Sequence, residues 1–552
     1  MENIVEIFKK HKHLIAFGIS ISIILFSFVF IFSLQDNNTF FLKDIEGDRN
    51  VLSDLIITAY LQDQWHGQKI RIEKGRLSHK FEYYENEDDM HMPPIKYGNG
   101  ATDDKYSYWY YYSYEIASDA NTRTEYSENK VELPLNNGTT IEATEKITTI
   151  YADKIDIYMS VNVNWPLWSK DRKKGEPDKS RLKFKTGMAL IRDEMDFKFE
   201  RKITSYSGGG HSEQELNFKN RDLVQPYYGN FALTTLKDKQ YFTVPNQDTE
   251  LSGENGIFMA VEYVDTITFL LNGGKEYGKV KKLVNFNLEE ENIRILGLHV
   301  VEDNLVLVML VNDILTFRAY DPNDGKLLAE LAVPEFDIPN PLEIIYYTPY
   351  IHENTMSLSF IGLNPSYYQN GILNRPDYFS IVSVKLESTD DTSTDNVNTN
   401  NITADTSQPA DIGSNTRKTK IELLYCINRF KLNNTKLNNV VVSEVSAVVP
   451  VNNKLVVFAV LREGQSNEVT TANENLYPSH FTIFIFGKKQ DSFVKSQDSS
   501  EMMQQTMNKF SELLYAGEII TDAKDDILSQ SNSYYENRNI ELVTVKGAEN
   551  ND

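Results

Sequence analysis

The chain has 552 residues and is strongly acidic, with 79 Asp and Glu residues against 56 Lys and Arg residues and a net charge of −23. So negative a surface excludes nucleic acid as a general partner. There is one cysteine, Cys426, which excludes a disulfide within the chain, and a chain this long can bury a core without one. Because Cys426 lies in an alternating apolar run, we expect it to be a packed strand residue.

The first predicted element is a transmembrane helix over Leu14–Leu34. Its 21 residues carry no charge, and at about 1.5 Å per residue they span roughly 30 Å, the hydrocarbon thickness of a bilayer. The alternative is a cleavable signal peptide, whose apolar region is only about 7–15 residues and ends in a small-x-small site. The segment is longer and ends in bulky residues, so the sequence favours a permanent membrane anchor.

The residues before this segment predict the orientation of the chain. They contain three lysines and two glutamates, and excess positive charge keeps such a flank cytoplasmic. We therefore predict a cytoplasmic tail over residues 1–13, a linker over 35–44 and an extracytoplasmic domain over 45–552. The low cysteine content and the many Asn, Lys and Ile residues are typical of a bacterial cell-surface protein.

An aromatic run, "KYSYWYYYSYEI", occupies residues 105–116. Exposed aromatic rings stack on sugars, which makes this run a candidate binding platform. The alternative, which the alternation favours, is a β-strand whose rings are buried between sheets. The platform candidates are Tyr108, Trp109, Tyr110 and Tyr112.

A local reversal of charge follows at residues 165–185. Eight basic residues stand against three acidic ones in "KDRKKGEPDKSRLKFK", directly after two tryptophans. Each basic residue near an anionic surface contributes about 1 kcal/mol, so this segment is a candidate contact surface for lipid headgroups or an anionic envelope polymer. The alternative is a solvated basic hairpin loop. The candidate residues are Trp165, Trp168, Lys170, Arg172, Lys173, Lys174, Lys179, Arg181, Lys183 and Lys185.

Short apolar alternations separated by turns recur along the rest of the chain and predict an all-β fold. The clearest unit, Asn292–Val333, divides into four apolar runs at the turns Asp303-Asn304, Asn312-Asp313 and Pro322–Gly325. We predict one four-stranded antiparallel sheet there. The same polar pair followed by an apolar alternation recurs, with irregular spacing, at five other positions: Asp63, Asp153, Asp238, Asn354 and Asn453.

The segment "FRAYDPNDGKLLAEL" resembles the hairpin between the third and fourth strands of propeller blades in the PQQ-like and WD40-like superfamilies. The residues that carry this resemblance are Tyr320, Asp321, Pro322, Gly325 and Lys326. It implies a β-propeller, which the repeat count sets at six or seven four-stranded blades, and it implies no cofactor. Two β-sandwich domains are the alternative, since the same alternation permits them.

Two segments are predicted to lie outside the strands. Residues 388–416 have almost no apolar side chains, which predicts a disordered insertion. Residues 499–514 carry apolar residues at helical spacing, which predicts a short helix.

No sequence motif predicts a catalytic residue, a metal site or a cofactor site. The sequence therefore favours a non-enzymatic module that binds a protein or an anionic envelope polymer through one face of the propeller and its loops. The alternative is an exported hydrolase or lyase whose carboxylates come together from several blades at the propeller channel.

Overall fold

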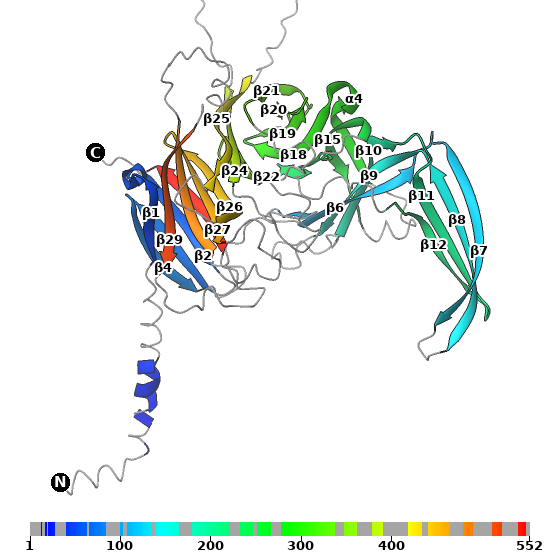
Figure 1. Cartoon of the computed structure of the whole chain (residues 1–552), viewed down its shortest axis with the longest axis horizontal. Helices are drawn as coiled ribbons and strands as arrows, with labels where there is room; N and C mark the ends of the chain where they lie inside the picture. Colours follow the sequence, from blue (N-terminus) through cyan, green and yellow to red (C-terminus); the bar gives the residue numbers. More distant parts are fainter. Residues whose placement is uncertain are drawn as a thin grey trace, which may run out of the picture.

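Antiparallel β-sheets make up almost all of the structure, which confirms the predicted all-β class (Figure 1). This computed structural model describes residues 13, 17–18, 20–27, 40–62, 66–83, 100–102, 107–134, 139–164, 179–220, 232–237, 239–246, 251–265, 278–336, 347–361, 378–389, 418–432, 440–463, 479–488, 511–521 and 539–547.

The two ends of the chain meet in two neighbouring sheets. One has the order β1-β29-β28-β27-β26 and the other the order β30-β2-β3-β4, so each sheet joins N-terminal and C-terminal strands. The strands of the first are β1 (Phe40–Gly47), β26 (Val440–Val451), β27 (Lys454–Glu463), β28 (Ser479–Gly487) and β29 (Glu512–Thr521). Those of the second are β2 (Leu55–Gln62), β3 (His66–Glu73), β4 (Arg76–Tyr83) and β30 (Asn539–Gly547).

Two further sheets are meanders of consecutive strands. The first contains β18 (Ile293–Val301), β19 (Asn304–Val311), β20 (Ile314–Tyr320) and β21 (Leu327–Val333). The second contains β22 (Tyr347–His352), β23 (Thr355–Phe360), β24 (Tyr378–Thr389) and β25 (Lys418–Lys431). The first confirms the four-stranded unit and the predicted turns at Asn312-Asp313 and Pro322–Gly325, whereas the turn predicted at Asp303-Asn304 lies one residue earlier, at Glu302-Asp303, because Asn304 begins β19.

A nine-stranded sheet contains two four-stranded groups and the short β16 (Val264–Asp265). One group is β5 (Gly100–Thr102), β6 (Ser107–Ile116), β9 (Lys154–Asn164) and β10 (Lys179–Ile191); the other is β13 (Leu233–Leu236), β14 (Lys239–Phe242), β15 (Leu251–Glu262) and β17 (Lys279–Asn287). Strands β10 and β15 pair where Gly187 and Gly253 meet. A Cβ atom on Gly253 would lie 2.6 Å from the carbonyl oxygen of Gly187, so this approach requires glycine.

The last sheet has the order β12-β11-β8-β7 and projects from the others (Figure 1). Its strands are β7 (Thr122–Pro134), β8 (Thr140–Ala152), β11 (Phe197–Tyr206) and β12 (His211–Phe218). We call these four strands the arm. Besides the strands, the described residues include the 3₁₀ helix η1 (Arg49–Leu52) and the one-turn helix α4 (Leu288–Glu291), which begin after the capping residues Asp48 and Asn287.

Several sheets of the body are buried on both faces. On β19, Leu305, Leu307 and Met309 pack into a cluster shared with the β13–β17 group. The alternate residues Val306, Val308 and Leu310 pack into a cluster shared with the β22–β25 sheet. Three further clusters repeat this arrangement, so the sheets are packed in the succession of the chain.

The N-terminal predictions are partly described. Residues 17–18 and 20–27 of the predicted Leu14–Leu34 segment are helical, but within the described part of the chain no helix is long and apolar enough to cross a membrane. The predicted linker over 35–44 is wrong from Phe40 onward, because Phe40 begins β1. Leu42 is buried there and the strand pairs with β29.

Two other predictions need correction at their boundaries. Ser388 and Thr389, predicted to be disordered, end β24 and pair with Thr419 and Lys418, while residues 390–416 lie outside the described residues. The predicted helix over 499–514 is wrong at its end, where residues 512–514 belong to β29 and pair with β28; residues 499–510 are not described. Cys426 is buried on β25, as predicted.

The pairing of β30 with β2 predicts that the C-terminal strand is essential for stability. Val545 on β30 is 3 % exposed and packs in the same cluster as Ile57 of β2. Val545→Asp buries a carboxylate there, and we expect it to lower the free energy of unfolding by about 3 kcal/mol. Guanidinium unfolding of the full chain measures this, with Val261→Asp at a 59 % exposed position as the control. Equal midpoints for the two variants would contradict the role of β30.

Candidate interaction site

The arm is the part of the structure with the least internal packing. Most side chains of β7 and β12 are exposed, and those of β8 and β11 are mostly half-buried. A sheet normally needs one face packed on a core to be stable. The arm therefore presents two open faces and two edges, which makes it the candidate interaction site.

Aromatic packing connects the arm to the body at one end. Phe197 and Phe199 of β11 are buried in the cluster that also holds Tyr110 and Tyr112 of β6. The Phe218 ring of β12 lies 5.0 Å from the Phe199 ring and 5.0 Å from the Tyr114 ring. The hydrophobic contacts of the arm are thus concentrated at its root.

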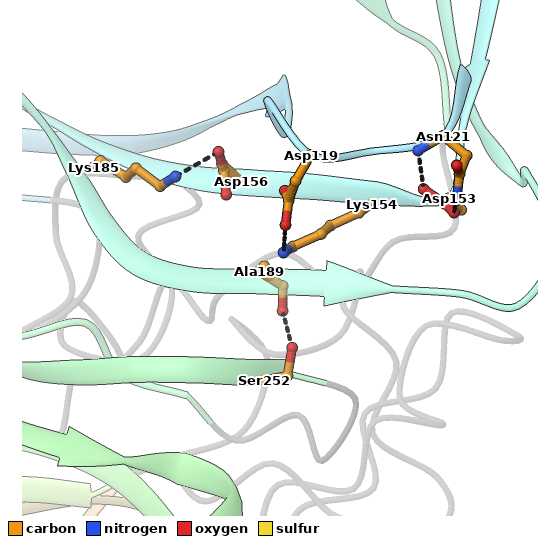
Figure 2. Close-up of polar contacts among 8 residues, drawn as sticks. All are labelled: Asp119, Asn121, Asp153, Lys154, Asp156, Lys185, Ala189 and Ser252. Atoms are coloured by element: carbon orange, nitrogen blue, oxygen red, sulfur yellow. Dashed lines mark hydrogen bonds and ion pairs between the residues drawn. The ribbon is translucent and has the colours of Figure 1, made fainter. Parts of the chain in front are cut away.

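A polar clamp at the root ties together three of the chain segments that pass between body and arm (Figure 2). The carboxylate of Asp153 accepts hydrogen bonds from the backbone N–H of Asn121 (2.8 Å) and from its side-chain amide (2.6 Å). The carbonyl oxygen of Asp153 accepts a bond of 2.9 Å from the N–H of Arg192. Asp153 therefore joins the passages from β6 to β7, from β8 to β9 and from β10 to β11.

Ion pairs extend this clamp into the body. The Lys154 ammonium lies 2.6 Å from the Asp119 carboxylate, which lowers the pKa of Asp119, and Lys185 of β10 lies 2.7 Å from Asp156 of β9. On the far side of β10, the Ser252 hydroxyl donates to the carbonyl oxygen of Ala189 at 3.3 Å (Figure 2). The arm thus continues from strands that are fixed on both sides.

Away from the root, charged pairs replace hydrophobic packing. Lys202 pairs with Glu145, and Arg201 pairs with Glu213 across β11 and β12. Lys146 of β8 lies 3.5 Å from Glu128 of β7. The pairs of Arg201 with Glu213 and of Lys146 with Glu128 are exposed, and such pairs each contribute about 1 kcal/mol or less, so the outer arm depends mainly on its backbone ladders.

One face of the outer arm carries a small apolar stripe. Val131 and Leu133 of β7 lie opposite Ala143 and Ile141 of β8, and Tyr206 of β11 lies beside Ala143. On the opposite face, Tyr126 is 81 % exposed. Tyrosine and apolar groups in such positions are typical of binding surfaces.

The predicted aromatic platform lies in β6 at the edge of the body. Tyr110 and Tyr112 are buried, which corrects their assignment to an exposed platform and agrees with the strand alternative. The backbone of Tyr108 and Trp109 pairs with β5 and β9, while their side chains lie outside the described residues. Burial follows because Tyr110 and Tyr112 pack in one cluster with Phe242 and Phe258 of the β13–β17 group.

The predicted basic surface is only partly described. Trp165, Trp168, Lys170, Arg172, Lys173 and Lys174 lie outside the described residues, and Lys179 is described only as part of the β10 backbone. The other three candidates, Arg181, Lys183 and Lys185, lie on β10. Lys183 pairs with Glu115 at 2.5 Å and Lys185 pairs with Asp156, so these two lysines are neutralised by neighbouring strands.

A buried polar pair lies between two body sheets. His299 of β18 and Tyr347 of β22 are each nearly fully buried, and the His299 Nε2 atom lies 2.7 Å from the Tyr347 hydroxyl. Burial lowers the pKa of His299 to about 3, which keeps the ring neutral, and raises the pKa of Tyr347. Within the described residues, no group of three or more His, Cys, Asp or Glu side chains is arranged to hold a metal ion.

The sequence pattern does not predict the arm. The residues around Asp153 predict the turn of a repeat, yet Asp153 links two different sheets. A usable signal was present: residues 122–133 combine strand-like alternation with polar residues on both faces, which a strand buried in a body cannot have.

Comparisons with known proteins give no assignment. No protein-family model matches the chain, and no curated protein matches it. Among solved structures, a variant of the Synechocystis apocarotenoid oxygenase is 6 % identical, with 93 % of this chain and 96 % of that chain covered and a TM-score of 0.26. A post-proline cleaving enzyme from Rickettsia typhi is 9 % identical, with coverages of 68 % and 58 % and a TM-score of 0.17. These scores are too low to support an argument about fold or activity.

The clamp predicts that Asp153 fixes the root of the arm. Asp153→Ala removes both acceptors of Asn121, so we expect local opening at the root to increase and amide hydrogen exchange over residues 117–125 to quicken about tenfold or more. Hydrogen-exchange mass spectrometry measures this. Asp193→Ala, on the exposed connection between β10 and β11, is the matched control and should leave the exchange unchanged. Equal protection in both variants would refute the role of Asp153.

The buried histidine predicts a loss of stability in acid. The pKa of His299 in the folded chain is about 3, below the ordinary value of 6.5. Below pH 6.5 the unfolded chain binds a proton at His299 that the folded chain does not bind, so the free energy of unfolding decreases as the pH falls from 6.5 toward 3. Between pH 7 and pH 5 this contributes a loss of about 2 kcal/mol. His299→Gln should remove this part of the pH dependence of unfolding, whereas His352→Gln, at an exposed position, should keep it. If the free energy of unfolding depends on pH in the same way for wild type and His299→Gln, this role of His299 is excluded.

Proposed function

We propose that the chain is a membrane-tethered, extracytoplasmic β-propeller that acts as a non-enzymatic binding module, and that the arm presents its binding surface to a protein or an anionic envelope polymer. The single observation that carries this proposal is the arm itself: a four-stranded sheet that the body does not cover and that has open faces and edges. Exposed sheet surface of this kind is a template for a partner.

The support for a propeller is the grouping and stacking of the strands. Six groups of four antiparallel strands follow one another: β2–β4 with β30, then β5, β6, β9 and β10, then β13–β15 with β17, then β18–β21, β22–β25 and β26–β29. Five apolar clusters lie between neighbouring groups, and one of them packs the last group on the first; among the described residues no such cluster joins the group of β2–β4 and β30 to the group of β5, β6, β9 and β10. Sheets with two apolar faces are expected to stack around an axis until they close, and pairing of the last strand with the first group is one way to close them.

This stacking favours a propeller over two β-sandwich domains. In a sandwich each sheet packs on one partner and leaves its other face to solvent. Here the alternate residues of β19 and of β27 enter two different clusters, so both of these sheets have two packed neighbours. The expected blade number is six.

The membrane tether rests on the sequence of Leu14–Leu34. A tethered module with a projecting arm brings its binding surface to a fixed range of distances from the membrane. A hydrolase or lyase would instead need carboxylates beside a histidine at the channel. The described histidine between two body sheets, His299, faces the hydroxyl of Tyr347, so we propose the binding function.

The proposal predicts that shortening the arm abolishes binding. In the shortened-arm variant, residues 126–148 and 201–216 are each replaced by Asn-Gly, which joins the paired positions Glu125 to Thr149 and Glu200 to Asn217. We expect co-sedimentation of the full chain with envelopes isolated from the source cells to fall about tenfold or more, because partner contacts provide the affinity. Thermal unfolding of the variant confirms that the body is intact.

A second variant separates the arm from the basic segment. Neutralisation of Lys170, Arg172, Lys173 and Lys174 to Gln should reduce co-sedimentation much less than the shortened arm does. If the shortened-arm variant binds as well as wild type while this variant does not, the arm is not the binding surface.

A further inference from the structure

We propose that the outer edge of β7 pairs antiparallel with β7 of a second copy of the chain, about a two-fold axis at Asn129, so that two arms form one eight-stranded sheet. This inference rests on the proposed role of the arm as a binding surface, and it names the occupant of one edge. Within the described structure, β7 pairs only with β8, and eleven of its thirteen side chains are exposed, nine of them in an unbroken run from Thr122 to Lys130.

The hydrogen bonds at the two ends of β8 show which backbone groups of β7 face outward. The N–H of Asp153 donates to the carbonyl oxygen of Asn121, and the N–H of Ser207 donates to the carbonyl oxygen of Glu142. Residues of β8 at odd positions therefore bond to β7, and those at even positions bond to β11. It follows that the even residues of β7 direct their backbone groups to the open edge: Thr124, Tyr126, Glu128, Lys130 and Glu132.

The charges at these outward positions alternate in sign and suit pairing of β7 with itself. A two-fold axis perpendicular to the sheet leaves each residue on the same face in both copies. Residues that oppose each other also share a face, and faces alternate along a strand, so their numbers are both odd or both even and the axis passes through a residue. With the axis at Asn129, Glu128 of each copy lies opposite Lys130 of the other. Opposite charges at directly opposed positions stabilise a strand pair.

The two adjacent registers lack this match, and an axis at Val131, which would oppose Lys130 and Glu132, would limit the paired segment to residues 128–134. An axis at Glu128 places two glutamates opposite each other, and an axis at Lys130 does the same for two lysines. The axis at Asn129 also places the exposed Tyr126 opposite Glu132 and places Pro134 at the end of the paired segment. Proline has no N–H group to donate there, so the ladder ends at that point.

The other edge of the arm is protected against self-pairing. Strand β12 is shorter, and pairing it with itself about Gln214 places Glu213 opposite Glu215. Like charges at opposed positions destabilise a strand pair. The two edges of one sheet therefore differ: β12 carries charges that repel a copy, and β7 carries charges that attract one.

The first test uses charge reversal on the full chain in detergent. Lys130→Glu converts both opposed pairs into glutamate pairs, and we expect the dimer dissociation constant from sedimentation equilibrium to rise about tenfold or more. The triple variant Glu128→Lys, Lys130→Glu, Lys146→Glu restores the opposed pairs and also preserves the pair between positions 128 and 146, so it should restore the dimer. Lys281→Glu, an exposed change of the same sign on β17, is the matched control and should leave dimerisation unchanged.

The second test fixes the register. Asn129→Cys places two thiols opposite each other at the axis, within reach of a disulfide, so mild oxidation should give a cross-linked dimer. Glu125→Cys is the control, because its two copies lie about 27 Å apart in this register, at about 3.4 Å per residue. The native Cys426 is buried and is present in both variants.

The outcomes separate this inference from the proposed function. A wild-type chain that stays monomeric, or an Asn129→Cys variant that cross-links no faster than Glu125→Cys, overturns self-pairing. If Lys130→Glu lowers envelope co-sedimentation and the triple variant does not restore it, the edge binds a strand of another protein, and self-pairing is again overturned. In each of these cases the effect of the shortened arm on envelope binding still decides the proposed function independently.

Discussion

The structure depends on burying both faces of successive four-stranded sheets. Alternate residues of β19 and β27 belong to different apolar clusters, so neither sheet has a face that water could occupy. Removing either of these two sheets would expose apolar surface on both of its neighbours. The chain ends meet in two of these sheets: β1 extends the sheet of β29, β30 completes the sheet of β2, and the two sheets share one apolar cluster.

Local turn chemistry made much of the body predictable. The turns at Asn312-Asp313 and Asn452-Asn453 place both residues at positive φ, which asparagine and aspartate tolerate and which the tight turns of β-hairpins require. Sequence alone therefore located β18–β21 and β26–β27. The same kind of signal at Asp153 gave a wrong prediction of a hairpin turn. Asp153 passes between two sheets because β8 pairs with β7 and β11, and the residues of the turn do not encode this pairing.

The candidate site was less predictable for a related reason. Lys183 and Lys185 look like a basic patch in sequence, but their partners Glu115 and Asp156 lie 68 and 29 residues away on neighbouring strands. A local count of charges cannot include partners that only sheet pairing brings close. Similarly, the rings of β6 appear available for binding until the β13–β17 group is packed over Tyr110 and Tyr112.

The arm shows how a protein can extend a sheet into solvent without a core of its own. Its root is fixed by Phe197, Phe199 and Phe218 and by the bonds of Asp153, so the entropy of ordering the outer strands is reduced by a rigid start. Beyond the root the backbone ladders and exposed ion pairs give only modest stability. An arm that is stiff at its root and weakly held at its end gains most from a partner that adds hydrogen bonds along an edge, and β7 offers the longer of its two edges.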